Sequence, residues 1–212
     1  MITQQQIETV LGQTIDPTTG KDYLTSKAVS DIQINQDNVS VNIELGYPAN
    51  SVLNTVHQQI EQAVRTVPGI GSITVNVTSN IIAYSAQRKL KLIPGVKNVI
   101  AVASGKGGVG KSATATNLAL ALAAEGATVG ILDADIYGPS QPQMLGVSGR
   151  PDSPDGKTIE PMRAHGIQMM SIGLLIDVET PMVWRGPMVT QALQQLLNDT
   201  LWHDLDYLVI DL

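Results

Sequence analysis

A glycine-rich segment of eight residues constrains the fold of this chain more than any other feature of its sequence. Residues 105–112 read Gly-Lys-Gly-Gly-Val-Gly-Lys-Ser and match the pattern G-x-x-x-x-G-K-[ST]. They follow an apolar run at 99–103, which predicts a buried strand, and precede an Ala- and Leu-rich stretch at 112–125, which predicts a helix. Strand, glycine loop and helix in this order are the context in which the pattern forms a phosphate-binding P-loop.

The residue types in this loop suit a polyphosphate. Glycine allows backbone conformations that other residues avoid, so that successive N–H groups can converge on phosphate oxygens. The start of the following helix adds positive potential at the same place. We therefore expect Lys111 to reach the β- and γ-phosphates and Ser112 to ligate Mg²⁺. The predicted nucleotide-binding residues are Gly105, Lys106, Gly107, Gly108, Val109, Gly110, Lys111, Ser112 and Ala113.

Carboxylates end two further predicted strands. Asp133 and Asp135 follow an apolar strand at 128–132, and Asp211 closes the apolar run at 207–211. Because ligands bind at the carboxyl ends of strands in open α/β sheets, these acids are expected beside the nucleotide. We predict that Asp135 orients the attacking water, that Asp133 supports the Mg²⁺ shell and that Asp211 holds Mg²⁺ through water. Alternatively, Asp133 and Asp135 cap a turn or a helix, and many buried strands simply end in an aspartate.

The order of patterns predicts an α/β protein in two parts. Residues 97–212 alternate strands with helices, which favours a P-loop domain with a mainly parallel sheet. A Pro- and Gly-rich stretch at 138–166 is too long for a simple connection, so a function, mobility or a small hairpin is expected there. Residues 1–80 read helix, strand, strand, helix, strand, which predicts a small α+β domain. A linker is predicted at 81–96.

Composition excludes several classes of protein. The 212 residues carry a net charge of −6, whereas a general binder of nucleic acid or of acidic membranes usually has the opposite sign. There is no cysteine, which excludes disulfides and thiolate metal sites within these residues. No apolar run reaches the roughly 18 residues of a membrane span, and the first residues lack a signal-peptide pattern. We expect a cytoplasmic protein that binds neither nucleic acid nor membrane.

Three segments together resemble the Mrp/ApbC family of P-loop ATPases, which are implicated in carrying and delivering iron–sulfur clusters. They are K-N-V-I-A-V-A-S-G-K-G-G-V-G-K-S at 97–112, D-A-D-I-Y-G-P-S at 133–140 and W-R-G-P-M at 184–188. The first is shared with septum-positioning and plasmid-partition ATPases, whereas the other two are more selective. The N-terminal part is similar to the small iron–sulfur-assembly domain that often precedes this ATPase, through Asp16-Pro17, Leu45-Gly-Tyr-Pro48 and Val67-Pro-Gly-Ile-Gly71.

The resemblance implies further roles. Lys106, the extra lysine inside the loop, marks the deviant Walker A group, in which this lysine reaches across a dimer to the other subunit's nucleotide. The segment 133–140 corresponds to the nucleotide-responsive switch I. The catalytic set is then Lys106, Lys111 and Asp135, and the metal set is Ser112, Asp133 and Asp211. The implied protein is a homodimer that hydrolyses ATP with Mg²⁺ and delivers an iron–sulfur cluster to apo-proteins.

The family pattern continues past Leu212 with a second switch, further strands, a base-binding segment and a C-x-x-C cluster site. We therefore expect a C-terminally truncated chain that has an incomplete sheet, carries no cluster ligands and is inactive alone. Two other functions stay open. A partition-type spatial organiser shares the fold and Lys106, although it should lack W-R-G-P-M and the small N-terminal domain. A non-enzymatic, nucleotide-dependent scaffold would use the switch without turnover.

Overall fold

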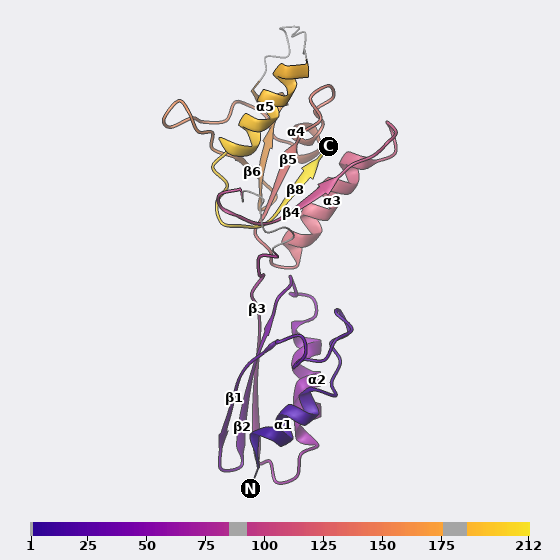
Figure 1. Ribbon diagram of the computed structural model, residues 1–212, viewed down its shortest axis with the longest axis vertical. Helices are drawn as coiled ribbons and strands as arrows, with labels where there is room; N and C mark the ends of the chain where they lie inside the picture. Colours follow the sequence, from indigo (N-terminus) through magenta and orange to yellow (C-terminus); the bar gives the residue numbers. More distant parts are fainter. Residues whose placement is uncertain (1, 85–92, 176–185) are drawn as a thin grey trace. The chain divides into compact units, whose positions relative to one another are not determined.

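The computed structural model describes residues 2–84, 93–175 and 186–212. The chain divides into two compact units, Met1–Ile81 and Ile82–Leu212, hereafter unit 1 and unit 2 (Figure 1). The predicted linker, 81–96, is described only in part. Its residues Ile82 and Tyr84 hydrogen-bond to Asn98, and the first strand of unit 2 begins at Val96.

Unit 1 is a three-stranded sheet covered by two helices. Its elements, in chain order, are α1 (Gln4–Leu11), β1 (Val29–Asn35), β2 (Asn38–Leu45), α2 (Leu53–Arg65) and β3 (Ser72–Ser79). The sheet order is β1-β2-β3, with β1 antiparallel and β3 parallel to β2. The alternation along β2 buries one row of apolar side chains against the apolar stripes of both helices. Central members of this core are Ile7, Leu11, Val41, Ile43, Leu45, Val56, Ile60 and Val64.

Unit 2 is an α/β domain built on a five-stranded sheet. Its elements are β4 (Val96–Val102), α3 (Lys111–Ala124), β5 (Val129–Asp133), α4 (Gln141–Leu145), β6 (Met162–Ala164), β7 (Ile167–Ser171), the 3₁₀ turn Ile172–Leu174, α5 (Gly186–Asn198) and β8 (Leu205–Asp211). The sheet order is β4-β8-β5-β7-β6, and every neighbouring pair is parallel except β6 with β7. The predicted α/β class, with a mainly parallel sheet after a small α+β part, is confirmed.

Burial in unit 2 follows its topology. Strands β5 and β7 are buried along their whole length, as expected for inner strands with helices on both faces. Helix α5 packs over Leu132, Met170 and Leu208 on one face, whereas α3 contacts β4, β5 and β8. No helix within the described ranges is long and apolar enough to cross a membrane.

The long Pro- and Gly-rich stretch has structure of its own. It contains α4, and it ends in the β6–β7 hairpin, whose turn residues His165 and Gly166 have positive φ. A hairpin was one of the predicted outcomes for this stretch. Of the W-R-G-P-M segment, Trp184 and Arg185 lie outside the described residues. Helix α5 begins at Gly186, within this segment.

Candidate functional site

The parallel sheet brings three chain segments together at one edge. Across the β4–β8 pair Val102 lies opposite Asp211, and across the β5–β8 pair Asp133 lies opposite Asp211. The glycine-rich loop leaves β4 at this edge, and the 134–140 loop leaves β5 there. Residues that are about 100 positions apart in sequence therefore share one site, because strand β8 lies between β4 and β5.

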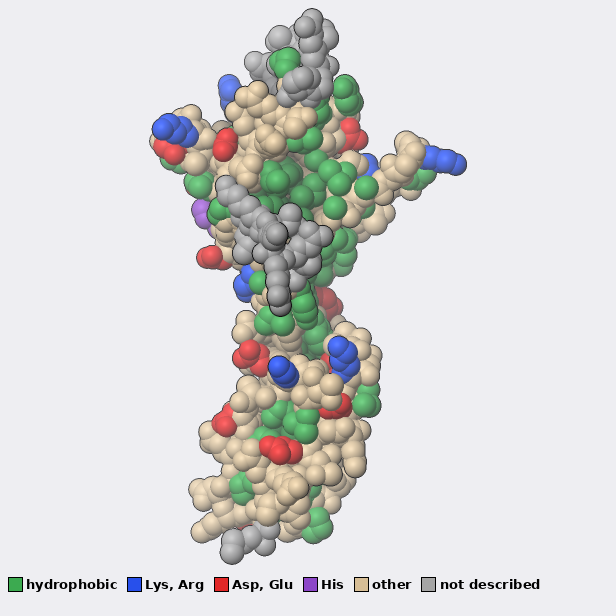
Figure 2. Space-filling model, viewed as in Figure 1, with side chains coloured by type: hydrophobic (Ala, Val, Ile, Leu, Met, Phe, Trp, Pro, Cys, Tyr) green, Lys and Arg blue, Asp and Glu red, His purple; other side chains and the backbone are tan. Residues whose placement is uncertain are grey.

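The glycine-rich loop is exposed, and two of its glycines have a left-handed backbone conformation. Gly108 and Gly110 have φ of 74° and 88°, a region that favours glycine. Gly110 is also the N-cap of α3, and no side chain caps this helix end, which leaves its N–H groups for a ligand. Ser104 Oγ accepts from the Lys106 N–H at 3.2 Å and holds the start of the loop. Figure 2 shows the loop projecting from unit 2, with a blue, basic side chain at its end.

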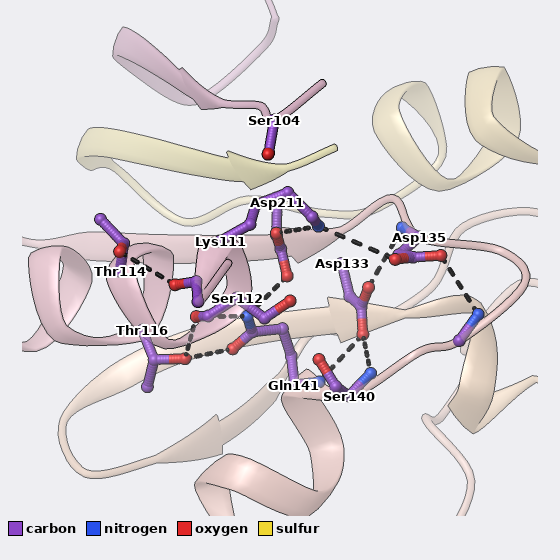
Figure 3. A network of polar contacts seen from close by, with 12 residues as sticks. Ser104, Lys111, Ser112, Thr114, Thr116, Asp133, Asp135, Ser140, Gln141 and Asp211 are labelled. Atoms are coloured by element: carbon purple, nitrogen blue, oxygen red, sulfur yellow. Dashed lines mark hydrogen bonds and ion pairs between the residues drawn. The ribbon is translucent and has the colours of Figure 1, made fainter. Parts of the chain in front are cut away.

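Lys111 lies between two carboxylates (Figure 3). Its Nζ forms an ion pair with Asp211 Oδ1 and lies 3.8 Å from Asp135 Oδ2. The Lys111 side chain is 15% exposed, the Asp211 side chain is fully buried and the Asp135 side chain is 36% exposed. A cation is therefore held at the first turn of α3, next to the loop where phosphate oxygens would bind.

Asp133 is the anchor of the 134–140 loop. Its Oδ2 accepts from the Ser140 N–H at 2.9 Å, the Gln141 N–H at 3.0 Å and Ser171 Oγ at 3.2 Å, and its Oδ1 accepts from the Asp135 N–H at 3.2 Å. Burial raises the pKa of the Asp133 carboxyl, and the charge of Asp211 adds to this effect, while the hydrogen bonds from Gln141, Asp135 and Ser171 oppose it. The geometry gives Asp133 a loop-holding function beside its predicted metal role, and that role stays a prediction.

Asp135 faces the site from the same loop. Its Oδ1 accepts from the Gly138 N–H at 3.1 Å, while its Oδ2 is directed to Lys111. Asp135 therefore combines a turn-capping contact, which the sequence also allowed, with a position at the mouth of the site. Its predicted part in orienting water is untested.

Sequence reasoning missed Gln141, which is completely buried at the start of α4. Its Nε2 donates to Asp211 Oδ2 at 2.8 Å and to the Ser112 carbonyl at 3.1 Å, and its Oε1 accepts from Thr116 Oγ1 at 2.7 Å. The available signal was slight. It was a polar residue directly after D-A-D-I-Y-G-P-S, at a position where a short helix begins.

The residues present fit a nucleotide with a divalent cation. The donor set offered by Ser112, Asp133 and Asp211 consists of oxygens, the atoms that Mg²⁺ prefers. No cluster of three or more acids or histidines among the described residues could hold a metal unaided. A Mg²⁺ ion bound with a nucleotide would take its remaining ligands from phosphate and water. The Ser140 Oγ is buried in the same loop and has no hydrogen-bond partner among the described residues, so a polar group is still to be satisfied here.

A glycine loop between strand and helix, with its lysine set among carboxylates from neighbouring parallel strands, defines a P-loop nucleotide-binding protein. The family model described as ParA, NUBPL iron-transfer P-loop NTPase, matches residues 95–212. The chain belongs to this family, which confirms the family resemblance drawn from the motifs. A second model, described as iron-sulfur cluster assembly protein, matches residues 4–77 of unit 1.

Curated relatives extend the similarity over most of the chain. The iron-sulfur cluster carrier protein of Haemophilus influenzae is 44% identical over 210 residues, which are 99% of this chain and 57% of the relative. That of Escherichia coli K12 is 47% identical over 92% of this chain and 53% of its own length. That of Synechocystis is 42% identical over 100% of this chain and 61% of its own length. The chain thus spans little more than half the length of these relatives.

Proposed function

We propose that this chain supplies the nucleotide-binding part of an ATP-hydrolysing carrier that binds iron–sulfur clusters and delivers them to apo-proteins. The observation that supports this most is the position of Lys111 beside Asp135 and Asp211, at the start of the P-loop helix. Relatives that share both units are named iron-sulfur cluster carriers. The cluster ligands belong to residues outside this chain, because these 212 residues contain no cysteine.

The nucleotide would enter at the exposed glycine loop. The N–H groups of residues 105–113 would bind phosphate oxygens, and Lys111 would leave Asp211 to neutralise the β- and γ-phosphates. Ser112 and Asp211, with Asp133 behind them, would then hold Mg²⁺. Bound Mg²⁺ supplies charge neutralisation on the phosphates. The base would be adenine, a choice that rests on the family.

Two groups would act on the transferring phosphoryl group. Asp135 would orient the attacking water, since its carboxylate already faces the lysine at the mouth of the site. Lys106 would complete the partner subunit's site in a homodimer and stabilise charge in the transition state, as an arginine finger does. Hydrolysis would gate the binding or release of a cluster between the two subunits. We place this cycle in the cytoplasm, with apo iron–sulfur proteins as recipients.

The direct test is anaerobic reconstitution of the intact protein with iron and sulfide, followed by visible absorption and by transfer to an apo-acceptor with and without MgATP. We expect a chromophore that moves to the acceptor, at a rate that MgATP changes. In Lys111→Ala the effect of MgATP should vanish, while Lys157→Ala, an exposed lysine outside the site, should behave like the wild type. Absence of a stable cluster would favour the spatial-organiser function if ATPase activity is intact, and the nucleotide-dependent scaffold if nucleotide binds without turnover.

A further inference from the structure

Gln141 connects four elements of unit 2 through a single side chain and its own N–H group. The side-chain amide reaches Asp211 at the end of β8, together with the carbonyl of Ser112 and the hydroxyl of Thr116 in α3. The backbone N–H of Gln141 donates to Asp133 at the end of β5. The residue itself begins α4 (Figure 3).

A buried glutamine is costly unless its amide is satisfied, and this one is fully satisfied. Both hydrogens of Nε2 have acceptors, at 2.8 Å and 3.1 Å, and Oε1 lies 2.7 Å from the Thr116 hydroxyl, whose one hydrogen it shares with the Ser112 carbonyl. Burying an amide without partners costs about 1–3 kcal/mol by mutational measurements. The amide is therefore fixed in one orientation, because rotating it by half a turn would place its oxygen against the oxygens of Asp211 and Ser112.

The two oxygens of Asp211 have separate partners. Oδ1 is bound by Lys111, whereas Oδ2 is bound by Gln141. When Lys111 moves to a polyphosphate, Asp211 Oδ1 loses its partner and becomes available to a group bound with the nucleotide. The contact with Gln141 does not depend on Lys111, so this contact keeps the plane of the carboxylate fixed through the change.

We propose that Gln141 is the positioning residue that orients Asp211 for the divalent cation of the bound nucleotide, and that it links this orientation to the 134–140 loop. The inference rests on the proposed function, since it assigns a role within the same nucleotide site. Gln141 directly follows the last residue of this loop in the chain, and the N–H groups of Ser140 and Gln141 both donate to Asp133. A movement of this loop would displace the amide and release Asp211 Oδ2.

The test separates nucleotide binding from cation binding in the intact protein. Affinity for a fluorescent ATP analogue is measured first in EDTA and then during titration with Mg²⁺. In Gln141→Leu we expect the Mg²⁺ concentration at half-saturation to rise about tenfold, the size of effect seen when groups that orient metal ligands are removed. The affinity without Mg²⁺ should change less than about threefold, because the glycine loop and Lys111 are intact.

Thr116→Val is the matched control. It removes the donor to Gln141 Oε1 but leaves both hydrogen bonds of Nε2 in place, so its Mg²⁺ dependence should match the wild type. If Gln141→Leu fails to fold, the double variant Thr116→Val/Gln141→Leu also removes the Thr116 hydroxyl, so that position 116 presents no polar side chain to the leucine. The double variant should still show the raised Mg²⁺ requirement.

The outcomes distinguish this inference from the proposed function. Wild-type Mg²⁺ dependence in a folded Gln141→Leu protein overturns the positioning role and leaves nucleotide binding untouched. Equal losses with and without Mg²⁺ also overturn it, because they indicate a structural role alone. If the wild-type protein binds no nucleotide, the proposed function itself fails.

Discussion

Replacing Lys111 by alanine should destabilise unit 2 as well as remove its phosphate-binding cation. Asp211 is fully buried, and Lys111 Nζ is the only cation that contacts it within the described residues. Removing one member of a buried ion pair typically costs 3–5 kcal/mol, since the other charge is left uncompensated. Lys111 is 15% exposed and Gln141 still donates to Asp211, so we expect about 3 kcal/mol, the lower end of that range.

A double variant separates stability from binding. In Lys111→Met/Asp211→Asn neither position of the former ion pair is charged, and the new amide oxygen can still accept from Gln141 Nε2. We expect the free energy of unfolding to recover to within about 1 kcal/mol of the wild type, the size of one neutral hydrogen bond. Affinity for MgATP should stay lost, because the cation for the phosphates is absent.

The free energy of unfolding is measured by urea titration, with tryptophan fluorescence as the signal. Both tryptophans, Trp184 and Trp202, belong to unit 2, so the signal reports this unit alone. With a slope of about 2 kcal/mol per molar urea, a loss of 3 kcal/mol moves the midpoint by about 1.5 M. An unchanged midpoint in Lys111→Ala would refute the buried ion pair. Unchanged affinity for MgATP would refute the P-loop assignment.

Three further perturbations test other parts of the molecule. Lys106→Ala should keep MgATP binding but lose hydrolysis in a turnover assay, and normal turnover would exclude the contact across the dimer. Burial and the negative charge of Asp16 raise the pKa of Tyr47 to about 12, so the folded state holds this proton more tightly than the unfolded chain does. The free energy of unfolding should therefore fall as the pH rises from 10 to 12. Urea unfolding followed by circular dichroism should show a smaller fall in Tyr47→Phe than in the wild type. An equal fall in both proteins would contradict the raised pKa of Tyr47. Gly130→Ala places a β-carbon 2.5 Å from Leu205 Cδ1 and should lower the free energy of unfolding, followed by tryptophan fluorescence, by about 1–3 kcal/mol. An unchanged free energy of unfolding would show that the core accepts this β-carbon without strain.

The parts of the fold that could be predicted are those set by local patterns. The strand, glycine loop and helix around residues 99–125 follow from hydrophobic periodicity and glycine placement within one short stretch. Alternation along Asn38–Leu45 likewise predicted a half-buried strand, and its apolar row faces the helices of unit 1. Such signals need no knowledge of distant residues, because the periodicity of a strand or a helix is expressed in its own sequence.

The contacts inside the site could not be predicted in the same way. Asp211 meets Lys111 and Asp133 because β8 lies between β4 and β5, and strand order is a property of the whole sheet. The amide of Gln141 gains its importance only once α4 packs beneath this edge. The sequence suggested metal binding for Asp133, whereas the hydrogen bonds show that both its oxygens also hold the 134–140 loop.

The buried carboxylate of Asp211 therefore needs a different cation in each of two states of the site. With Lys111 beside it, Asp211 is compensated by a cation from its own chain. Once Lys111 binds phosphate, the same carboxylate would be left with the neutral amide of Gln141, at a cost similar to that of removing the lysine. A divalent cation near Asp211 restores the missing positive charge. Nucleotide and Mg²⁺ are therefore expected to bind cooperatively, because each provides a charge that the other's arrival requires.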